Sequence, residues 1–233
     1  MITVIGLGVE QGDLTKRGEA EILRAASEGR KILVRTAKTK SYQTVQELGV
    51  PHICLDGIYE KSRSFATLAK NLAKAVAEAG DDAVYLVDGA ATEDNSVKAL
   101  IKRTRGKLQI VDGVSKVSAL VQKAGFIGCS YTAVSAYELL EKAERSTISL
   151  PLIVYDLDDS GLASDIKLAL GDCFGEETKV KYICDGQTKT IELFALDRQK
   201  KYDYTSAVAI EAQDLLQKTR FDTADLKEIV TRL

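Results

Sequence analysis

Three short loops of glycine and small residues are the segments of this sequence most suited to binding a ligand. They are Gly6-Leu7-Gly8, Asp88-Gly89-Ala90-Ala91-Thr92 and Asp112-Gly113-Val114-Ser115. Each follows an apolar run that predicts a β-strand, and glycine lets the main chain approach a ligand closely. Ligands of open α/β sheets gather where strands end. The loops therefore predict one small-molecule site, with plain tight turns as the alternative.

The first loop does not complete a nucleotide-binding motif. A G-x-G-x-x-G pattern would need glycine at Gln11, and the next strand ends in Arg35-Thr36 instead of an acidic residue for a ribose hydroxyl. An NADP site that uses Arg35 stays open as a minor alternative. The sequence contains no G-x-x-x-x-G-K-[ST] segment, which excludes a P-loop.

Scarce residue types and the charge balance exclude further functions. His52 is the only histidine, so a multi-histidine metal site is impossible and we predict no metal. The net charge is −2, from 32 basic and 34 acidic residues, which argues against a nucleic-acid partner. No stretch approaches the roughly 20 apolar residues of a membrane span. The four cysteines have no metal or redox spacing, and we predict reduced core residues of a cytoplasmic protein.

Strand and helix patterns alternate in the first half of the chain. The predicted strands cover residues 2–5, 31–34, 83–87 and 107–111, and the predicted helices cover residues 15–28 and 62–79. Such alternation predicts an α/β fold whose sheet is mostly parallel, with helices on both faces.

The pattern changes after about Gly125. Predicted helices cover residues 133–142 and 162–170, and predicted strands cover residues 151–157, 180–184, 190–196 and 207–211. Strands with little helix between them predict a second subdomain with a mixed sheet. We place the subdomains at residues 1–118 and 119–212, followed by a helical tail at 213–233.

The order of these segments resembles the tetrapyrrole (corrin/porphyrin) methylase family. More closely, nearly the whole chain is similar to the methylase-like domain that bacteria fuse to a MazG-type nucleotide pyrophosphohydrolase. Further segments that carry this likeness are residues 34–36, 55–60, 163–168 and 196–206, and residues 221–233 resemble the start of the MazG-type domain. The family usually has prolines in these three loops, and this chain has none there.

The resemblance implies two α/β subdomains that bind S-adenosylmethionine in the cleft between them. It assigns the cofactor contacts to Gly6, Gly8, Val9, Gly89, Ala90, Ala91, Thr92, Val114, Ser115, Tyr155 and Asp156. An acidic tetrapyrrole-like substrate needs basic contacts, for which Arg35 and Lys38, with Lys40, are candidates; a solvated basic loop is the alternative. No catalytic residue is assigned, because methyl transfer from a sulfonium depends mainly on positioning.

Together with the composition, the resemblance favours a cytoplasmic S-adenosylmethionine-dependent methylase of a small molecule, and it implies a homodimer. The alternative is a non-catalytic regulatory or assembly domain of a nucleotide pyrophosphohydrolase fusion. Asp88 and Asp112 place negative charge beside the predicted site, which predicts weak methylation of acidic tetrapyrroles. We also expect that the chain derives from a longer fusion and does not hydrolyse nucleoside triphosphates.

Overall fold

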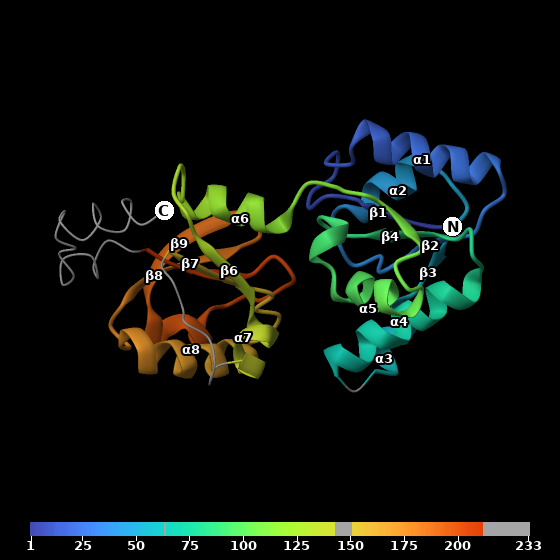
Figure 1. Cartoon of the computed structure of the whole chain (residues 1–233). Coiled ribbons are helices and arrows are strands. Elements are labelled where there is room, and N and C mark those ends of the chain that lie inside the picture. The colour runs from blue at the N-terminus through green and yellow to red at the C-terminus, as the bar shows by residue number, and fades with distance from the viewer. Residues whose placement is uncertain (63, 143–150, 212–233) are drawn as a thin grey trace, which may run out of the picture. The chain divides into compact units, whose positions relative to one another are not determined.

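The computed structural model describes residues 1–62, 64–142 and 151–211 (Figure 1). The chain divides into two compact units, with the break between Ala119 and Leu120, and each unit is described by itself. The predicted helical tail at residues 213–233 lies outside the described residues.

Within the described residues, the first unit contains a five-stranded sheet in which all strands are parallel. The strand order is β3-β2-β4-β1-β5. The strands are β1 (Ile2–Gly6), β2 (Ile32–Val34), β3 (Ile53–Cys54), β4 (Val84–Val87) and β5 (Leu108–Val111). Because parallel strands all end at one edge, the residues that follow them are gathered there.

Helices cover both faces of this sheet (Figure 1). Side chains alternate along each strand, so each strand contributes residues to the core on either face. Val84 and Leu86 of β4 share a core with α1 and α2, whereas Tyr85 and Val87 share a core with α4 and α5. The helices are α1 (Lys16–Ser27), α2 (Tyr42–Leu48), α3 (Asp56–Glu60), α4 (Phe65–Ala79) and α5 (Asn95–Arg103), with the 3-10 helix η1 (Ala91–Glu93). The helix α6 (Lys116–Ala124) spans the break between the units.

Side-chain caps fix where helices begin. The Thr15 hydroxyl accepts a hydrogen bond from the Gly18 N–H at 3.1 Å at the start of α1. The Asp159 carboxylate accepts one from the Leu162 N–H at 2.8 Å at the start of α8 (Ser160–Phe174). These bonds satisfy main-chain donors that have no partner inside the helix.

The second unit contains a mixed sheet. Its described strands form the order β6-β7-β10-β8-β9, in which β6 and β7 are parallel and the other pairs antiparallel. They are β6 (Thr132–Ser135), β7 (Leu152–Tyr155), β8 (Lys179–Cys184), β9 (Gln187–Glu192) and β10 (Ala207–Ile210). The parallel first sheet and the mixed second sheet confirm the predicted fold class.

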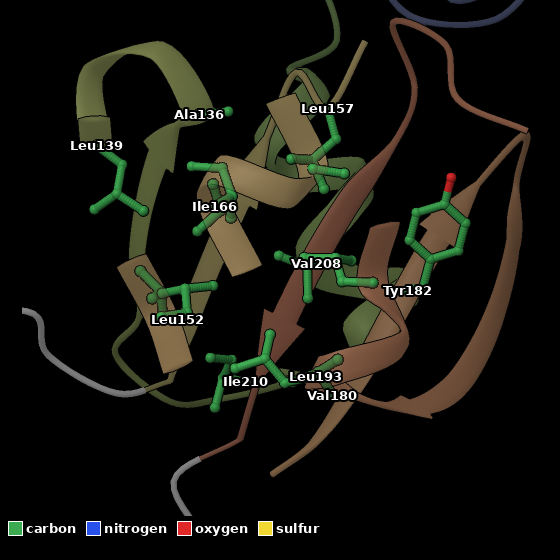
Figure 2. Packing of buried hydrophobic residues seen from close by; sticks show 14 of the residues in the cluster. Ala136, Leu139, Leu152, Leu157, Ile166, Val180, Tyr182, Leu193, Val208 and Ile210 are labelled. Atoms are coloured by element: carbon green, nitrogen blue, oxygen red, sulfur yellow. The ribbon is translucent and has the colours of Figure 1, made fainter. Parts of the chain in front are cut away.

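The second sheet is also covered on both faces. The helices α7 (Ala136–Lys142) and α8 and the 3-10 helix η2 (Leu193–Arg198) enclose one core with Leu152 and Val208 (Figure 2). On the other face, Leu120 of α6 packs in a cluster with Ile153 and Ile183. Both faces of the central strands are therefore apolar, as the short apolar runs in the sequence indicate.

Two predicted elements are wrong at their ends. Residues 133–135, predicted as helix, belong to β6, which pairs with β7, and α7 begins only after Ser135, whose hydroxyl accepts from the Glu138 N–H at 3.2 Å. Residues 193–196, predicted as strand, belong to η2. Leu193 and Leu196 are both fully buried, and the three-residue repeat of a 3-10 helix places them on the same side.

The prediction that the cysteines are core residues is also wrong. All four cysteines are free, but Cys54, Cys129 and Cys173 are exposed and Cys184 is half-buried. A neighbouring apolar run does not bury a cysteine that lies at an edge strand or on the outer side of a helix.

Among the described residues, no helix is both long and apolar enough to cross a membrane.

Candidate functional site

The three glycine loops meet at one edge of the first sheet. The chain leaves β1 towards α1 on one face and leaves β4 towards α5 on the other face. These strands are neighbours, so the sheet has a topological switch point between them, where ligands of open α/β sheets bind. The loops follow β1, β4 and the adjacent β5.

Gly6 and Gly113 allow the loops to touch through their main chains. A β-carbon at Gly6 would lie 2.6 Å from both the Gly113 nitrogen and the Gly89 oxygen. One at Gly113 would lie 2.5 Å from the Gly6 oxygen. No side chain fits at such distances, so these two glycines serve the packing of loop on loop.

Gly8 and Gly89 join the first two loops by a pair of hydrogen bonds. The Gly8 N–H donates to the Gly89 carbonyl at 3.2 Å, and the Gly89 N–H donates to the Gly8 carbonyl at 2.7 Å. Both residues have left-handed φ angles, +80° and +69°. A β-carbon at Gly8 would lie 2.2 Å from the Asp13 β-carbon, whereas one at Gly89 would meet no atom nearer than 3.7 Å. A β-carbon at Gly89 would therefore be in ordinary van der Waals contact with Lys116 and Glu93, and the left-handed φ is what favours glycine there.

Asp13 closes the first loop on itself. One oxygen of its carboxylate, Oδ2, accepts hydrogen bonds from the Val9 N–H at 3.0 Å and the Glu10 N–H at 2.9 Å. The main-chain donor of Val9, a predicted cofactor contact, is thus bonded within the loop.

Carboxylates likewise tie the second loop to the third. The Thr92 hydroxyl donates to Asp112 at 3.0 Å. The Glu93 carboxylate accepts from the Ser115 hydroxyl and, at 3.1 Å, from the Lys116 N–H at the start of α6. Thr92 and Ser115, both predicted cofactor contacts, therefore hold the loops in a fixed arrangement.

The remaining predicted contacts of these loops differ in exposure. Ala90 and Ala91 are buried, at 4% and 0% exposure, whereas Val114 is 40% exposed. Among these three residues, only Val114 has a side chain open to solvent, and the two alanines contribute to the packing under the loop.

Arg35 lies in a largely buried ion-pair network below the second loop. Its Nη1 is 3.1 Å from Asp88 Oδ1 and its Nε is 2.8 Å from Asp94 Oδ2. The guanidinium lies over the Tyr59 ring, 5.5 Å from its centroid, and Lys116 Nζ is 3.9 Å from the other Asp88 oxygen. The Asp88 and Asp94 side chains are each only 8% exposed.

Asp94 connects this network to the start of α5 and, through Ser96, to the buried Tyr85. Its Oδ1 accepts from the Ser96 N–H at 2.7 Å and caps α5. The Ser96 hydroxyl also lies 2.8 Å from the hydroxyl of the buried Tyr85. One carboxylate therefore fixes both the start of a helix and the position of Arg35.

The charges of the network stabilise one another. Burial opposes ionisation of Asp88, but Arg35 and then Lys116 outweigh it and hold the pKa of Asp88 below its usual value. Burial also opposes the charge on Arg35, yet Asp94 and Asp88 raise the pKa of Arg35 above its usual value. Asp88 therefore stays ionised, and its negative charge is matched by cations.

The other basic candidates lie outside this network. Lys38 is exposed, and its N–H donates to the Thr36 hydroxyl at 3.1 Å. Lys40 Nζ is 3.2 Å from the Glu10 carboxylate. Of the cations predicted to meet an acidic substrate, Arg35 and Lys40 are thus paired with acidic residues of the protein.

Tyr155 and Asp156 belong to the second unit. Tyr155 ends β7 and packs, partly buried, against the cluster that contains Ile153. Asp156 adopts a left-handed φ of +63°, which is uncommon for a residue other than glycine. A contact of either residue with the ligand of the loops stays a prediction.

Sequence reasoning missed the acidic residues that organise this edge: Asp13, Glu93 and Asp94. The sequence carried one usable signal, because Asp94-Asn95-Ser96 places a capping residue directly before a helical pattern. Asp13 bonds within its own loop, to the Val9 and Glu10 N–H groups, but no helical pattern follows it directly to mark it as a cap. Glu93 carried no such signal, since its partners Ser115 and Lys116 lie on another loop. In the described part of the chain, no group of three or more histidine, cysteine or acidic residues could hold a metal ion.

Solved structures with this fold include methyltransferases. The chain superimposes on the uroporphyrin-III C-methyltransferase of Thermus thermophilus in complex with S-adenosylhomocysteine, with a TM-score of 0.61 and 13% identity, covering 92% of this chain and 99% of that one. It also superimposes on the precorrin-6Y methylase of Archaeoglobus fulgidus, with a TM-score of 0.58 and 16% identity over 91% and 97% of the two chains.

A third solved structure with this fold is a diphthine synthase. Its TM-score is 0.53 and its identity 16%, over 90% of this chain and 89% of that one. No protein-family model matches the chain, and no curated protein is significantly similar to it in sequence. The chain therefore has the fold of these methyltransferases.

Proposed function

We propose that this protein binds S-adenosylmethionine at the three glycine loops of its first unit and transfers the methyl group to a small molecule. The observation that carries the proposal is the convergence of Gly6, Gly89 and Gly113 at the switch point of a parallel sheet. The likeness to a methyltransferase structure that contains S-adenosylhomocysteine supports the choice of cofactor.

The residues at this edge fit such a cofactor in shape and charge. Gly89 keeps the second loop free of a side chain at a left-handed position, and Val114 of the third loop exposes an apolar side chain. Asp112 is exposed and carries a negative charge, which suits a sulfonium cation. Bound there, S-adenosylmethionine would supply an electrophilic methyl group.

The protein's own part in this reaction is positioning. The hydrogen bonds of Asp13, Glu93 and Asp112 hold the loops rigid before a ligand arrives, which lowers the entropy lost on binding. We expect the substrate to carry few carboxylates, because Arg35 and Lys40 are already paired. Methylation of tetrapyrroles rich in carboxylates should accordingly be weak.

A second candidate function is a non-catalytic binding domain that regulates or assembles a MazG-type nucleotide pyrophosphohydrolase. It is favoured by the internal bonding of Val9, Thr92 and Ser115, which leaves few polar side chains for a reaction. Both candidates share the cofactor site. Transfer of a labelled methyl group to a small-molecule acceptor would select the first, and binding without transfer would select the second.

Calorimetric titration with S-adenosylmethionine, S-adenosylhomocysteine and NADPH tests the site. We expect the first two to bind and NADPH not to bind. Gly89→Ala adds a methyl group where the main chain is expected to meet the ligand and should weaken binding at least about tenfold. Gly106→Ala is the matched control, because Gly106 also has a left-handed φ, +75°, with open space around it, but precedes β5.

Equal loss of affinity in both variants, or none in either, would contradict the site.

Light scattering during gel filtration tests the predicted homodimer, and a mass above that of one chain is expected.

A further inference from the structure

Tyr42, His52 and Cys54 form a continuous chain of hydrogen bonds beside the outer strand β3. Cys54 Sγ lies 3.7 Å from the Tyr42 hydroxyl, and this hydroxyl lies 3.0 Å from His52 Nε2. The other ring nitrogen, Nδ1, lies 2.8 Å from the Val50 carbonyl oxygen. The Tyr42 and His52 rings meet edge to face, with centroids 5.6 Å apart.

The Val50 carbonyl sets the direction of every proton in this chain. A carbonyl oxygen only accepts hydrogen bonds, so Nδ1 of His52 must carry the hydrogen. In the neutral ring, Nε2 then has a free electron pair and accepts from the Tyr42 hydroxyl. The Tyr42 oxygen, having donated its proton, accepts from the Cys54 thiol. The proton of the Cys54 thiol can therefore reach the base, His52, through the Tyr42 hydroxyl.

Cys54 is also open to reagents. Its side chain is exposed, and within the described residues β3 lies at one end of the strand order. Asp56 is the nearby acidic group, and its carboxylate accepts from the Thr36 hydroxyl and the Ala37 N–H. The hydrogen bond with Cys54, burial and the charges of Cys54 and Asp56 raise the pKa of Tyr42, so its hydroxyl is protonated at rest.

We propose that Cys54 is a reactive thiol that forms mixed disulfides with small-molecule disulfides, with Tyr42 and His52 accepting its proton. A nucleophile, a base within hydrogen-bond reach and a third group that orients the base are the parts needed to activate a weak nucleophile. Here they are Cys54, His52 acting through Tyr42, and the Val50 carbonyl. The site is separate from the three glycine loops, and the proposal does not depend on methyl transfer.

The reaction is a thiol–disulfide exchange. The Cys54 proton moves to the Tyr42 oxygen while the Tyr42 proton moves to His52 Nε2. The sulfur then forms a bond with one sulfur of the disulfide, whose S–S bond breaks. The leaving thiolate takes up the proton that His52 releases, so one disulfide and one thiol enter and one of each leaves.

The test is the rate at which each cysteine reacts with 4,4′-dithiodipyridine, an uncharged disulfide, followed by acid quenching and peptide mass analysis. At about pH 7, we expect Cys54 to react at least about tenfold faster than Cys129 and Cys173, since a positioned base speeds such steps by more than this in enzymes. Cys129 and Cys173 are matched controls because they are also free and exposed, while both ring nitrogens of the single histidine are already bonded elsewhere.

Tyr42→Phe keeps the ring and removes the hydroxyl that links the thiol to the base. It should bring the Cys54 rate to within about threefold of the control cysteines, and His52→Gln should do the same. At about pH 9.5, where ordinary thiols with a pKa of about 8.5 are ionised without help, wild type and Tyr42→Phe should react equally at Cys54.

A urea unfolding midpoint equal to that of wild type shows that each variant is folded. The proposal is overturned if Cys54 reacts no faster than the controls in the wild type. It is also overturned if Tyr42→Phe leaves the rate unchanged at pH 7, or if the difference persists at pH 9.5, because accessibility alone would then explain it.

Discussion

Each unit holds a cation between two carboxylates, but at a different depth below the surface. In the first unit, Arg35 lies between the carboxylates of Asp88 and Asp94, and its side chain is 22% exposed. In the second unit, Lys201 pairs with Asp185 and Asp203 in a similar fork, but its side chain is 57% exposed. Each cation meets two aspartates, but the Arg35 side chain is more deeply buried than that of Lys201.

Strand topology explains this difference. The parallel sheet collects all its carboxyl ends at one edge, so residues that follow different strands crowd together and bury one another. In the mixed sheet, antiparallel pairing sends consecutive strand ends to opposite edges, and Lys201 meets its partners at the surface. Removing one member of a buried set of charges leaves an uncompensated charge and is strongly destabilising, whereas an exposed pair contributes little.

Removing the buried cation should have the largest effect. Arg35→Met leaves Asp88 and Asp94 buried without their main cation and should lower the free energy of unfolding by about 3–5 kcal/mol. Urea unfolding measures this change. Arg35→Met combined with Asp88→Asn should lose less than the sum of the two single variants, because the stranded charge is partly removed. Additive losses would show that the pair does not interact.

Acid should weaken the first unit through Asp88. Its pKa is lowered in the folded protein, so its contribution is complete above the unfolded value of about 3.9 and is lost as the pH falls towards the folded value. Asp88→Asn should be less stable than wild type at about pH 6, and the gap should narrow towards about pH 3. Asp203, whose pKa is also lowered but which is more exposed, provides the matched Asp203→Asn control with a smaller gap. A gap that is constant with pH would contradict the role of Asp88.

The glycine contacts of the first unit should be more sensitive than its open turns. Gly6→Ala forces a β-carbon against two main-chain atoms and should lower the free energy of unfolding by about 2–3 kcal/mol. Gly12→Ala meets no atom within 4 Å but has a φ of +88°, so it should cost about 1 kcal/mol of backbone strain. Equal losses, measured by urea unfolding, would mean that loop contact is not what Gly6 provides.

The exposed fork should have the smallest effect. Lys201→Met removes a cation that water already surrounds, so the unfolding midpoint should match that of wild type within error. A clear loss would show that the second unit depends on this fork as the first depends on Arg35.

Most elements of the chain could be predicted from local pattern. The strand at residues 2–5 and the helix at 62–79 are close to the observed β1 and α4, because apolar spacing reflects which face is buried. One error was avoidable, since Ser135-Ala136-Tyr137-Glu138 has the S-x-x-E form of a capping box, which marks the true start of α7. The very short β3 is set by its pairing with β2, and two residues carry too little pattern to predict it.

The candidate site likewise has parts that the sequence predicts and parts that it does not. The sequence alone determined that small residues follow β1, β4 and β5, because a glycine-rich loop after an apolar strand is a local property. It could not show what Arg35 does, since its partners are 53 and 59 residues further along the chain. Only the order of strands in the sheet brings Arg35 beside Asp88 and Asp94, and only burial there changes a basic residue suited to a substrate into one that holds the loops in place.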